Sequence, residues 1–268
     1  MNTHVEHKQS PSVIPDITEP THTVSNQPPP LADYNAFDSD TALTEALERN
    51  GGGWGAERCR EFGAYAGGEM IELGFQANEN PPKLKTHDRY GHRIDEVEFH
   101  PAYHQVMAQA IKHELHALPW NESRPGAHVV RSALGYMNGQ FEAGHGCPIT
   151  MTYAAIPALR HQPDVAAVWE PRITSTEYDP RCLPAEQKTG ATIGMGMTEK
   201  QGGSDVRANT TRAYPVGQGG PGSDYELVGH KWFFSAPMCD AWLVLALTGT
   251  ESDNGISCFL APKWRPDG

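Results

Sequence analysis

The hydrophobic period of the sequence changes near Leu183-Pro184, and this change limits the folds open to the chain. Before it, apolar residues recur every three or four positions, as they do along one face of a helix. After it, short runs alternate apolar and polar residues, as strands do, and turn residues separate these runs. Helices followed by strands predict an α+β protein with an all-α N-terminal part and a sheet or barrel after it.

The helical part carries start and stop signals at several places. Ser39 and Asp40 can cap a helix whose apolar stripe Gly51 to Gly53 ends, and Pro101 has the place of a first-turn proline. We predict helices after Asp40, from Cys59 to Ala77 as one long element, and over residues 101–118, 129–141, 148–156 and 164–169.

The second part predicts an antiparallel sheet or barrel. The expected strands are residues 191–198, 209–216, 225–235, 241–248 and 256–261. Trp242 to Leu247 is wholly apolar, which is typical of a strand buried on both faces. Because the sequence stops at the turn signal Pro266-Asp267-Gly268, we expect this domain to be incomplete and a C-terminal helical domain to be absent. The predicted division is therefore an N-terminal arm at 1–30, a helical domain at 31–188 and a truncated β domain at 189–268.

Composition narrows the class of function. The 268 residues carry a net charge of −12, so this stretch offers no field that attracts nucleic acid or an anionic membrane. The five cysteines are scattered without C-x-x-C spacing, which argues against a disulfide framework and favours a reducing cytosol. No apolar run is long enough to span a bilayer. We expect a soluble, cytoplasmic protein.

The stretch from Ala191 to Asp205 has two interpretations. Its first half alternates like a strand, and Gly202-Gly203 with Ser204 then offers bare N–H groups and a hydroxyl, which suit a pyrophosphate. The same residues also suit an ordinary hairpin loop, and the stretch alone does not decide.

Other candidate sites have simpler explanations. His100 and His104, and likewise His113 and His116, have a spacing that could bind a metal, but no third ligand joins them, so surface placement is the better interpretation and no metal site is expected. For Glu199 we prefer a structural role to that of a general base. The aromatic run Trp232 to Phe234, followed by Ser235, suits a planar ring as well as a barrel core.

Together the two stretches resemble a known family. The run Met197-Thr-Glu-x-x-Gly-Gly-Ser-Asp205, followed by Gly229-His-Lys-Trp-Phe-Phe-Ser235, is similar to the middle-domain signature of the FAD-dependent acyl-CoA dehydrogenases. Asn80-Pro81-Pro82 and Cys147-Pro-Ile-Thr-Met-Thr-Tyr153 resemble the adaptive-response, alkylation-induced branch of that family. The common motifs differ in detail, since Phe233-Phe-Ser-Ala-Pro237 stands where Trp-Ile-Thr-Asn-Gly is usual.

The resemblance implies a flavin site. Met197 and Thr198 would lie along the pyrimidine side of the flavin, Ser204 would bind the pyrophosphate, and Ser235 would hydrogen-bond near flavin N5. The residues that the resemblance assigns to FAD binding are Met195, Gly196, Met197, Thr198, Gly203, Ser204, Phe233, Phe234 and Ser235. The family's catalytic Glu base lies in its C-terminal domain, so no catalytic residue is expected here.

The implied function is α,β-dehydrogenation of an acyl-CoA with hydride transfer to the flavin, in a homo-oligomer that is usually a tetramer. This stretch by itself is expected to be inactive. The alternative is a DNA-protecting flavoprotein of alkylation stress with weak or vestigial dehydrogenase activity. Any DNA contact would then come from the absent C-terminal part, because the acidic balance of this chain does not favour it.

Overall fold

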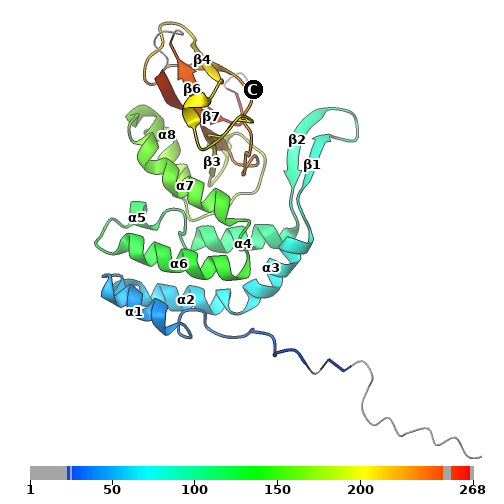
Figure 1. Ribbon diagram of the computed structural model, residues 1–268, viewed down its shortest axis with the longest axis vertical. Coiled ribbons are helices and arrows are strands. Elements are labelled where there is room, and N and C mark those ends of the chain that lie inside the picture. Colours follow the sequence, from blue (N-terminus) through cyan, green and yellow to red (C-terminus); the bar gives the residue numbers. More distant parts are fainter. Residues whose placement is uncertain (1–22, 25, 250–254, 266–268) are drawn as a thin grey trace, which may run out of the picture. The chain divides into compact units, whose positions relative to one another are not determined.

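A computed structural model describes residues 23–24, 26–249 and 255–265, and Figure 1 shows its elements. Residues 32–268 form one compact unit, separate from residues 1–31. Most of the predicted N-terminal arm lies outside the described residues. The helices are α1 (Thr41–Arg49), α2 (Ala56–Ala66), α3 (Glu69–Glu79), α4 (Pro101–Lys112), α5 (Leu118–Asn121), α6 (Ala127–Phe141), α7 (Gly146–Leu159) and α8 (Pro163–Ile173).

The helices begin and end where local chemistry dictates. The Asp40 side chain accepts a hydrogen bond from the N–H of Leu43 and so caps α1, while Pro101 occupies the first turn of α4. The predicted long helix over 59–77 is wrong in one respect, because the chain breaks between α2 and α3 at Gly67-Gly68. A Cβ on Gly67 would lie 2.0 Å from the carbonyl oxygen of Tyr34, so only glycine fits this close approach.

A two-stranded antiparallel hairpin interrupts the helical part, and the sequence did not lead us to expect it. Its strands, β1 (Lys83–His87) and β2 (Arg93–Glu98), form a separate sheet beside α3 and α4 (Figure 1). Every residue of β1 is exposed and no residue of β2 is more than partly buried, so neither strand has the buried apolar face that reveals a half-buried strand in a sequence.

The C-terminal part is a mixed sheet built around one central strand. Its strands are β3 (Ile193–Gly196), β4 (Arg212–Pro215), β5 (Tyr225–Val228), β6 (Ala241–Thr248) and β7 (Gly255–Pro262). β7 pairs antiparallel with the whole of β6 and β5 pairs antiparallel with β4, whereas β3 and β4 run parallel to β6. The predicted α+β class is confirmed, with no barrel closed by the described strands, but the N-terminal part is not all-α, because the hairpin of β1 and β2 lies between α3 and α4. The sheet is mixed rather than purely antiparallel.

Helix α7 joins the two parts of the core. Ile149 belongs to the cluster formed by α1, α2, α4 and α6, whereas Ala155, Ile156 and Leu159 pack with residues of α8, β3 and β6. Thr152 is fully buried between these groups, and its hydroxyl oxygen accepts a hydrogen bond from the N–H of Ile193 at 2.9 Å. The start of β3 is thereby attached to the helical core (Figure 1).

Candidate functional site

The candidate site lies between the end of β3 and the beginning of β4, both of which pair with β6. Gly196, the last residue of β3, pairs with Val244, and Arg212, the first residue of β4, pairs with Leu247. Because β7 covers one edge of β6 along its length, β3 and β4 must share the other edge. Between them residues 197–211 leave the sheet, and we call this segment the excursion loop. It contains the predicted Gly-Gly-Ser turn.

Residues 232–235, which we call the aromatic segment, approach the beginning of the excursion loop. The N–H of Trp232 donates a hydrogen bond to the carbonyl oxygen of Thr198 at 2.9 Å. The Phe234 ring lies so close to Gly196 that an added Cβ there would meet a ring carbon at 2.4 Å, and the ring also contacts Trp242. The structure therefore brings Trp232 and Phe234 to Thr198 and Gly196, although the two segments are far apart in the sequence.

The predicted strand over 225–235 is too long, and its last part has another role. β5 ends at Val228, and Phe233 has a φ of +58°, which side chains rarely adopt in a strand. Phe233 is 82% exposed, so it covers none of the core, whereas Phe234 is half-buried. The two phenylalanines thus offer different surfaces rather than one continuous wall.

The remaining predicted residues divide into a partly buried and an exposed group. Met195 and Met197 pack against the sheet core, and the carbonyl oxygen of Met197 accepts a hydrogen bond from Asn209 Nδ2 at 3.0 Å. A Cβ on Gly203 would lie 2.7 Å from Thr198 Oγ1, so this glycine lets the turn approach Thr198 closely. Ser204 and Ser235 are exposed.

Sequence reasoning gave Glu199 a structural role but missed its burial and its partner Lys231. Glu199 is 2% exposed and forms an ion pair of 2.9 Å with Lys231, so it is buried and paired, although its neighbours in the sequence gave no sign of this. Burial would raise the pKa of Glu199, but hydrogen bonds from Thr211, Thr210 and Lys231 outweigh it and hold the pKa well below its usual range. The available signal was the polar run Asn209-Thr210-Thr211 after the turn.

Two of the four histidines in the candidate pairs are not on the surface. His113 and His116 are buried, which contradicts the surface placement that we predicted. The His104 ring bonds to the Tyr178 hydroxyl, and His100 caps α4. No group of three or more His, Cys, Asp or Glu residues that could hold a metal occurs in the part of the chain that the structure describes.

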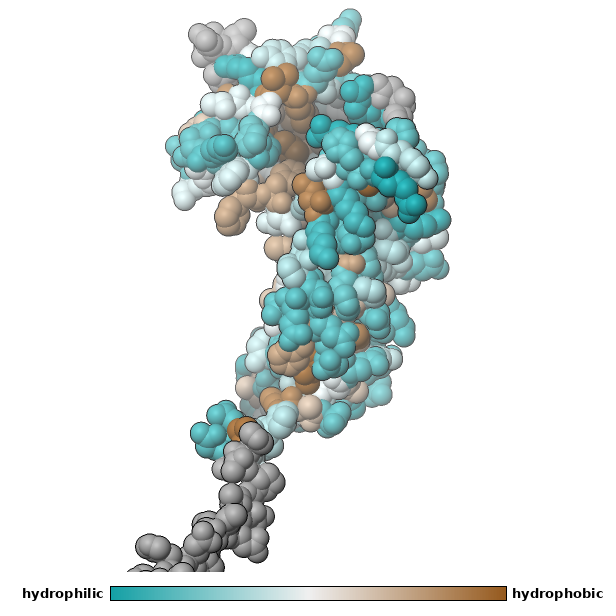
Figure 2. All heavy atoms as spheres, turned by 90° about the vertical axis from the view of Figure 1, so that its right-hand side faces the viewer, coloured by the Kyte–Doolittle hydropathy of each residue, from teal (hydrophilic) through white to brown (hydrophobic). Residues whose placement is uncertain are grey.

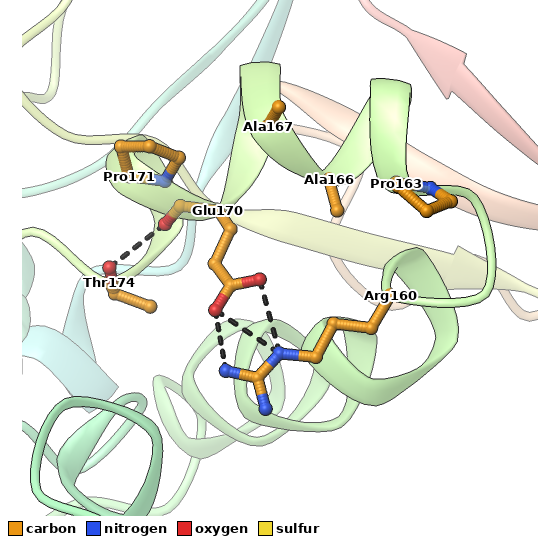
Figure 3. A pocket seen from close by; sticks show the side chains of 7 residues that line it. All are labelled: Arg160, Pro163, Ala166, Ala167, Glu170, Pro171 and Thr174. Atoms are coloured by element: carbon orange, nitrogen blue, oxygen red, sulfur yellow. Dashed lines mark hydrogen bonds and ion pairs between the residues drawn. The ribbon is translucent and has the colours of Figure 1, made fainter.

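Two cavities lie away from these residues. A shallow one of about 500 Å³ lies beside α8, where Arg160 and Glu170 point toward each other and form an ion pair of 2.6 Å (Figure 3). A smaller cavity of about 250 Å³ lies between the hairpin, α4 and residues 178–192, and the buried Tyr103 hydroxyl at its edge has no hydrogen-bond partner among the described residues. None of the predicted cofactor residues lines either cavity.

One face of the chain exposes apolar surface near the sheet. Figure 2 shows hydrophilic residues over most of this face and hydrophobic residues gathered in a recess in its upper half. In the described part of the chain, no helix combines the length and the apolar run that crossing a bilayer requires.

Comparison with known proteins agrees with this arrangement. Residues 26–180 match the family described as "Adaptive response protein AidB N-terminal domain", and residues 194–268 match "Acyl-CoA dehydrogenase, middle domain". The chain is 49% identical over 251 residues to the Escherichia coli (strain K12) protein named "Putative acyl-CoA dehydrogenase AidB", covering 92% of this chain and 45% of that protein. It is 27% identical to "Acyl-CoA dehydrogenase family member 11" of Caenorhabditis elegans, covering 75% of this chain and 33% of that protein.

Solved structures give the same fold. The Caenorhabditis elegans protein ACDH-11, crystallised in complex with C11-CoA, has a TM-score of 0.76 and 25% identity, covering 93% of this chain and 43% of that one. The apo form of Bd2924 also has a TM-score of 0.76, with 27% identity, covering 88% of this chain and 47% of that one. The chain thus spans less than half the length of each of these relatives.

Proposed function

The chain belongs to the acyl-CoA dehydrogenase family, in the branch of the adaptive response protein AidB, and on this premise we propose that it forms one part of an FAD site. The observation that supports this proposal is the meeting of the excursion loop with the aromatic segment. A turn of glycines and an exposed serine lies on the same loop as Thr198, whose carbonyl oxygen binds the N–H of Trp232. Phosphate-binding and ring-binding chemistry thus lie close together.

The residues present fit a dinucleotide with a planar ring. Gly202 has a φ of +155°, and its N–H donates to the carbonyl oxygen of Glu199 at 3.0 Å. The exposed Gly203 and Ser204 follow it, and their N–H groups and the serine hydroxyl would approach a pyrophosphate. The 82% exposed Phe233 offers a flat apolar face that a ring would cover. The positive φ of Phe233 is the kind of strained conformation that clusters at binding sites.

We assign the other predicted residues by the same reasoning. Met195, Gly196, Met197 and Thr198 would line the pyrimidine side of the ring, and the absence of a side chain at Gly196 gives Phe234 its place below them. Ser235, which is exposed at the end of the aromatic segment, would donate a hydrogen bond to the ring system. FAD, when bound, would supply the acceptor for a hydride from the substrate.

The proposed substrate is an acyl-CoA thioester. The relative from Caenorhabditis elegans was crystallised with C11-CoA, which supports this substrate class without fixing the acyl length. No residue of this chain is proposed as the base that removes the α-proton. A complete protein would act as a homo-oligomer in the cytoplasm, and this part alone would not dehydrogenate an acyl-CoA.

The test is a titration of FAD followed by quenching of flavin fluorescence. It uses the 268-residue chain and, in parallel, a version extended after Gly268 by the C-terminal part of the Escherichia coli relative. We expect the extended protein to bind FAD and to bleach its absorbance with an acyl-CoA under anaerobic conditions. If both proteins purify colourless and take up no FAD, the proposed function is wrong.

A second function, protection of DNA during alkylation stress, is favoured by the match to an adaptive response protein. Its test is the anisotropy of labelled duplex DNA at increasing salt, since phosphate contacts weaken as salt rises. Salt-sensitive binding without bleaching by acyl-CoA would support protection. Because this chain carries a charge of −12, we expect binding only by the extended protein.

A further inference from the structure

The Glu199 carboxylate collects hydrogen bonds from both ends of the excursion loop. Its Oε2 accepts from the Thr210 N–H at 2.7 Å, from the Thr210 hydroxyl at 2.9 Å and from Gln201 Nε2 at 2.7 Å. Its Oε1 accepts from the Thr211 N–H at 3.0 Å. Glu199 lies near the beginning of the loop and Thr211 at its end, so one side chain closes the whole excursion.

Lys231 connects this closed loop to the aromatic segment. Its ammonium donates to Glu199 Oε1 at 2.9 Å, and its side chain is only 10% exposed. Lys231 directly precedes Trp232, whose N–H donates to the Thr198 carbonyl oxygen. The side-chain contact and the backbone contact therefore hold the aromatic segment at the same position along the excursion loop. The low pKa of Glu199 keeps the carboxylate charged at neutral pH, and the attraction to Lys231 is therefore maintained.

A second buried ion pair lies at the other end of the sheet and has different neighbours. Lys188 Nζ lies 2.6 Å from Asp240 Oδ1, and the two side chains are 5% and 6% exposed. Asp240 also accepts from the Thr192 N–H at the start of β3. This pair is as buried as Glu199–Lys231, although burial raises the pKa of Asp240 whereas hydrogen bonds lower that of Glu199. Among the described residues, its hydrogen bonds and ion pair involve neither the excursion loop nor the aromatic segment.

We propose that Glu199 and Lys231 are positioning residues that keep the phosphate-binding turn in register with the aromatic segment, so that both engage one FAD molecule. This inference rests on the proposed flavin site. Neither residue needs to touch the cofactor. Without the pair, the turn and the aromatic segment could each still form, but their separation would no longer match the length of the cofactor.

The test compares variants of the extended protein. Glu199→Gln places the amide hydrogens of glutamine against groups that donate to Glu199, such as the N–H groups of Thr210 and Thr211. The double variant Glu199→Gln with Lys231→Met removes both charges, so no unpaired buried charge is left to destabilise the protein. Asp240→Asn is the matched control. For each protein, the FAD dissociation constant, the ADP dissociation constant and the midpoint of thermal unfolding are measured.

We expect the FAD dissociation constant to rise at least about tenfold in the Glu199→Gln and double variants, which corresponds to about 1.4 kcal/mol. ADP spans only the phosphate half of the site, so its affinity should change less than threefold. Asp240→Asn should also lower the unfolding midpoint, because it alters a buried ion pair, but it should leave FAD affinity within about twofold.

The outcomes separate this inference from the proposed function. If the unaltered extended protein binds no FAD, the flavin site itself is refuted. If it binds FAD and the double variant binds it equally well, the positioning role is refuted and the site stands. If FAD affinity falls in all three variants in proportion to their loss of thermal stability, the pair is only structural and the inference is likewise refuted.

Discussion

Replacing Thr152 with valine tests whether α7 holds the strand that leads into the site. Thr152 is fully buried, its hydroxyl donates to the Pro148 carbonyl oxygen at 2.7 Å, and its oxygen accepts from the Ile193 N–H at 2.9 Å. Valine keeps the shape but leaves that N–H without a partner in the core. An unsatisfied buried donor costs about 1–3 kcal/mol, so we expect Thr152→Val to lower the free energy of unfolding by about 2 kcal/mol.

Thr152→Ser is the matched control, because it keeps the hydroxyl and loses one methyl group. Removal of a buried methyl costs about 1 kcal/mol. Urea unfolding of the 268-residue chain, with a common slope for the three proteins, gives both differences. The reasoning requires the valine variant to be less stable than the serine variant. If valine is equally stable or more stable, packing rather than the hydrogen bond attaches β3 to α7.

Three further predictions follow from single features. Hydrogen bonds from His145 and Gly144 outweigh the effect of burial, which would raise the pKa of Glu142, and lower it to about 2. The unfolding free energy should therefore fall as pH drops from about 4.5 to about 2, and the fall should be smaller in Glu142→Gln across an acid series of urea unfolding curves, because other carboxylates with lowered pKa values, such as Glu199, still contribute to it. Phe233→Gly should raise the free energy of unfolding by about 1 kcal/mol, because it relieves a φ of +58° at an 82% exposed residue. The same change should weaken FAD binding. A fall in the free energy of unfolding would show that the ring packs on the protein. Leu134→Ala should cost about 2–5 kcal/mol in urea unfolding, since Leu134 is fully buried, and a loss below about 1 kcal/mol would contradict its place in the core.

Helix starts were predictable where their signals are local, but the predicted helix over 101–118 was wrong beyond Lys112, where α4 ends, because α5 begins separately at Leu118. The first-turn Pro101 and the cap at Asp40 act within one turn of their own position, so a sequence contains all the information needed. The break at Gly67-Gly68 was not predictable in this way, because its cause is the approach of Tyr34, which is distant in the sequence. The exposed hairpin was missed for a related reason, since strands without a buried face have no apolar period.

The end of β5 illustrates a different limit. The aromatic run 232–234 has high strand propensity, yet these residues leave the sheet. Strand propensity mainly reflects packing against neighbours, and here the neighbours are Thr198, Gly196 and Glu199 rather than another strand. The family resemblance placed these residues in one site before their contacts were known. It did not reveal Glu199 and Lys231 as the link between them.

The pairing of β6 explains why this link carries so much of the site. Gly196 pairs with Val244 and Arg212 pairs with Leu247. The two partners on β6 are three positions apart, whereas Gly196 and Arg212 are sixteen positions apart. A direct connection would therefore need only a few residues, and the chain instead extrudes a loop whose only regular element is the short 3-10 turn Val206–Ala208. Long irregular loops inside compact domains are uncommon and usually functional. Since one carboxylate bonds to both ends of this loop, the excursion and the site that we propose on it depend on Glu199 more than on any glycine of the turn.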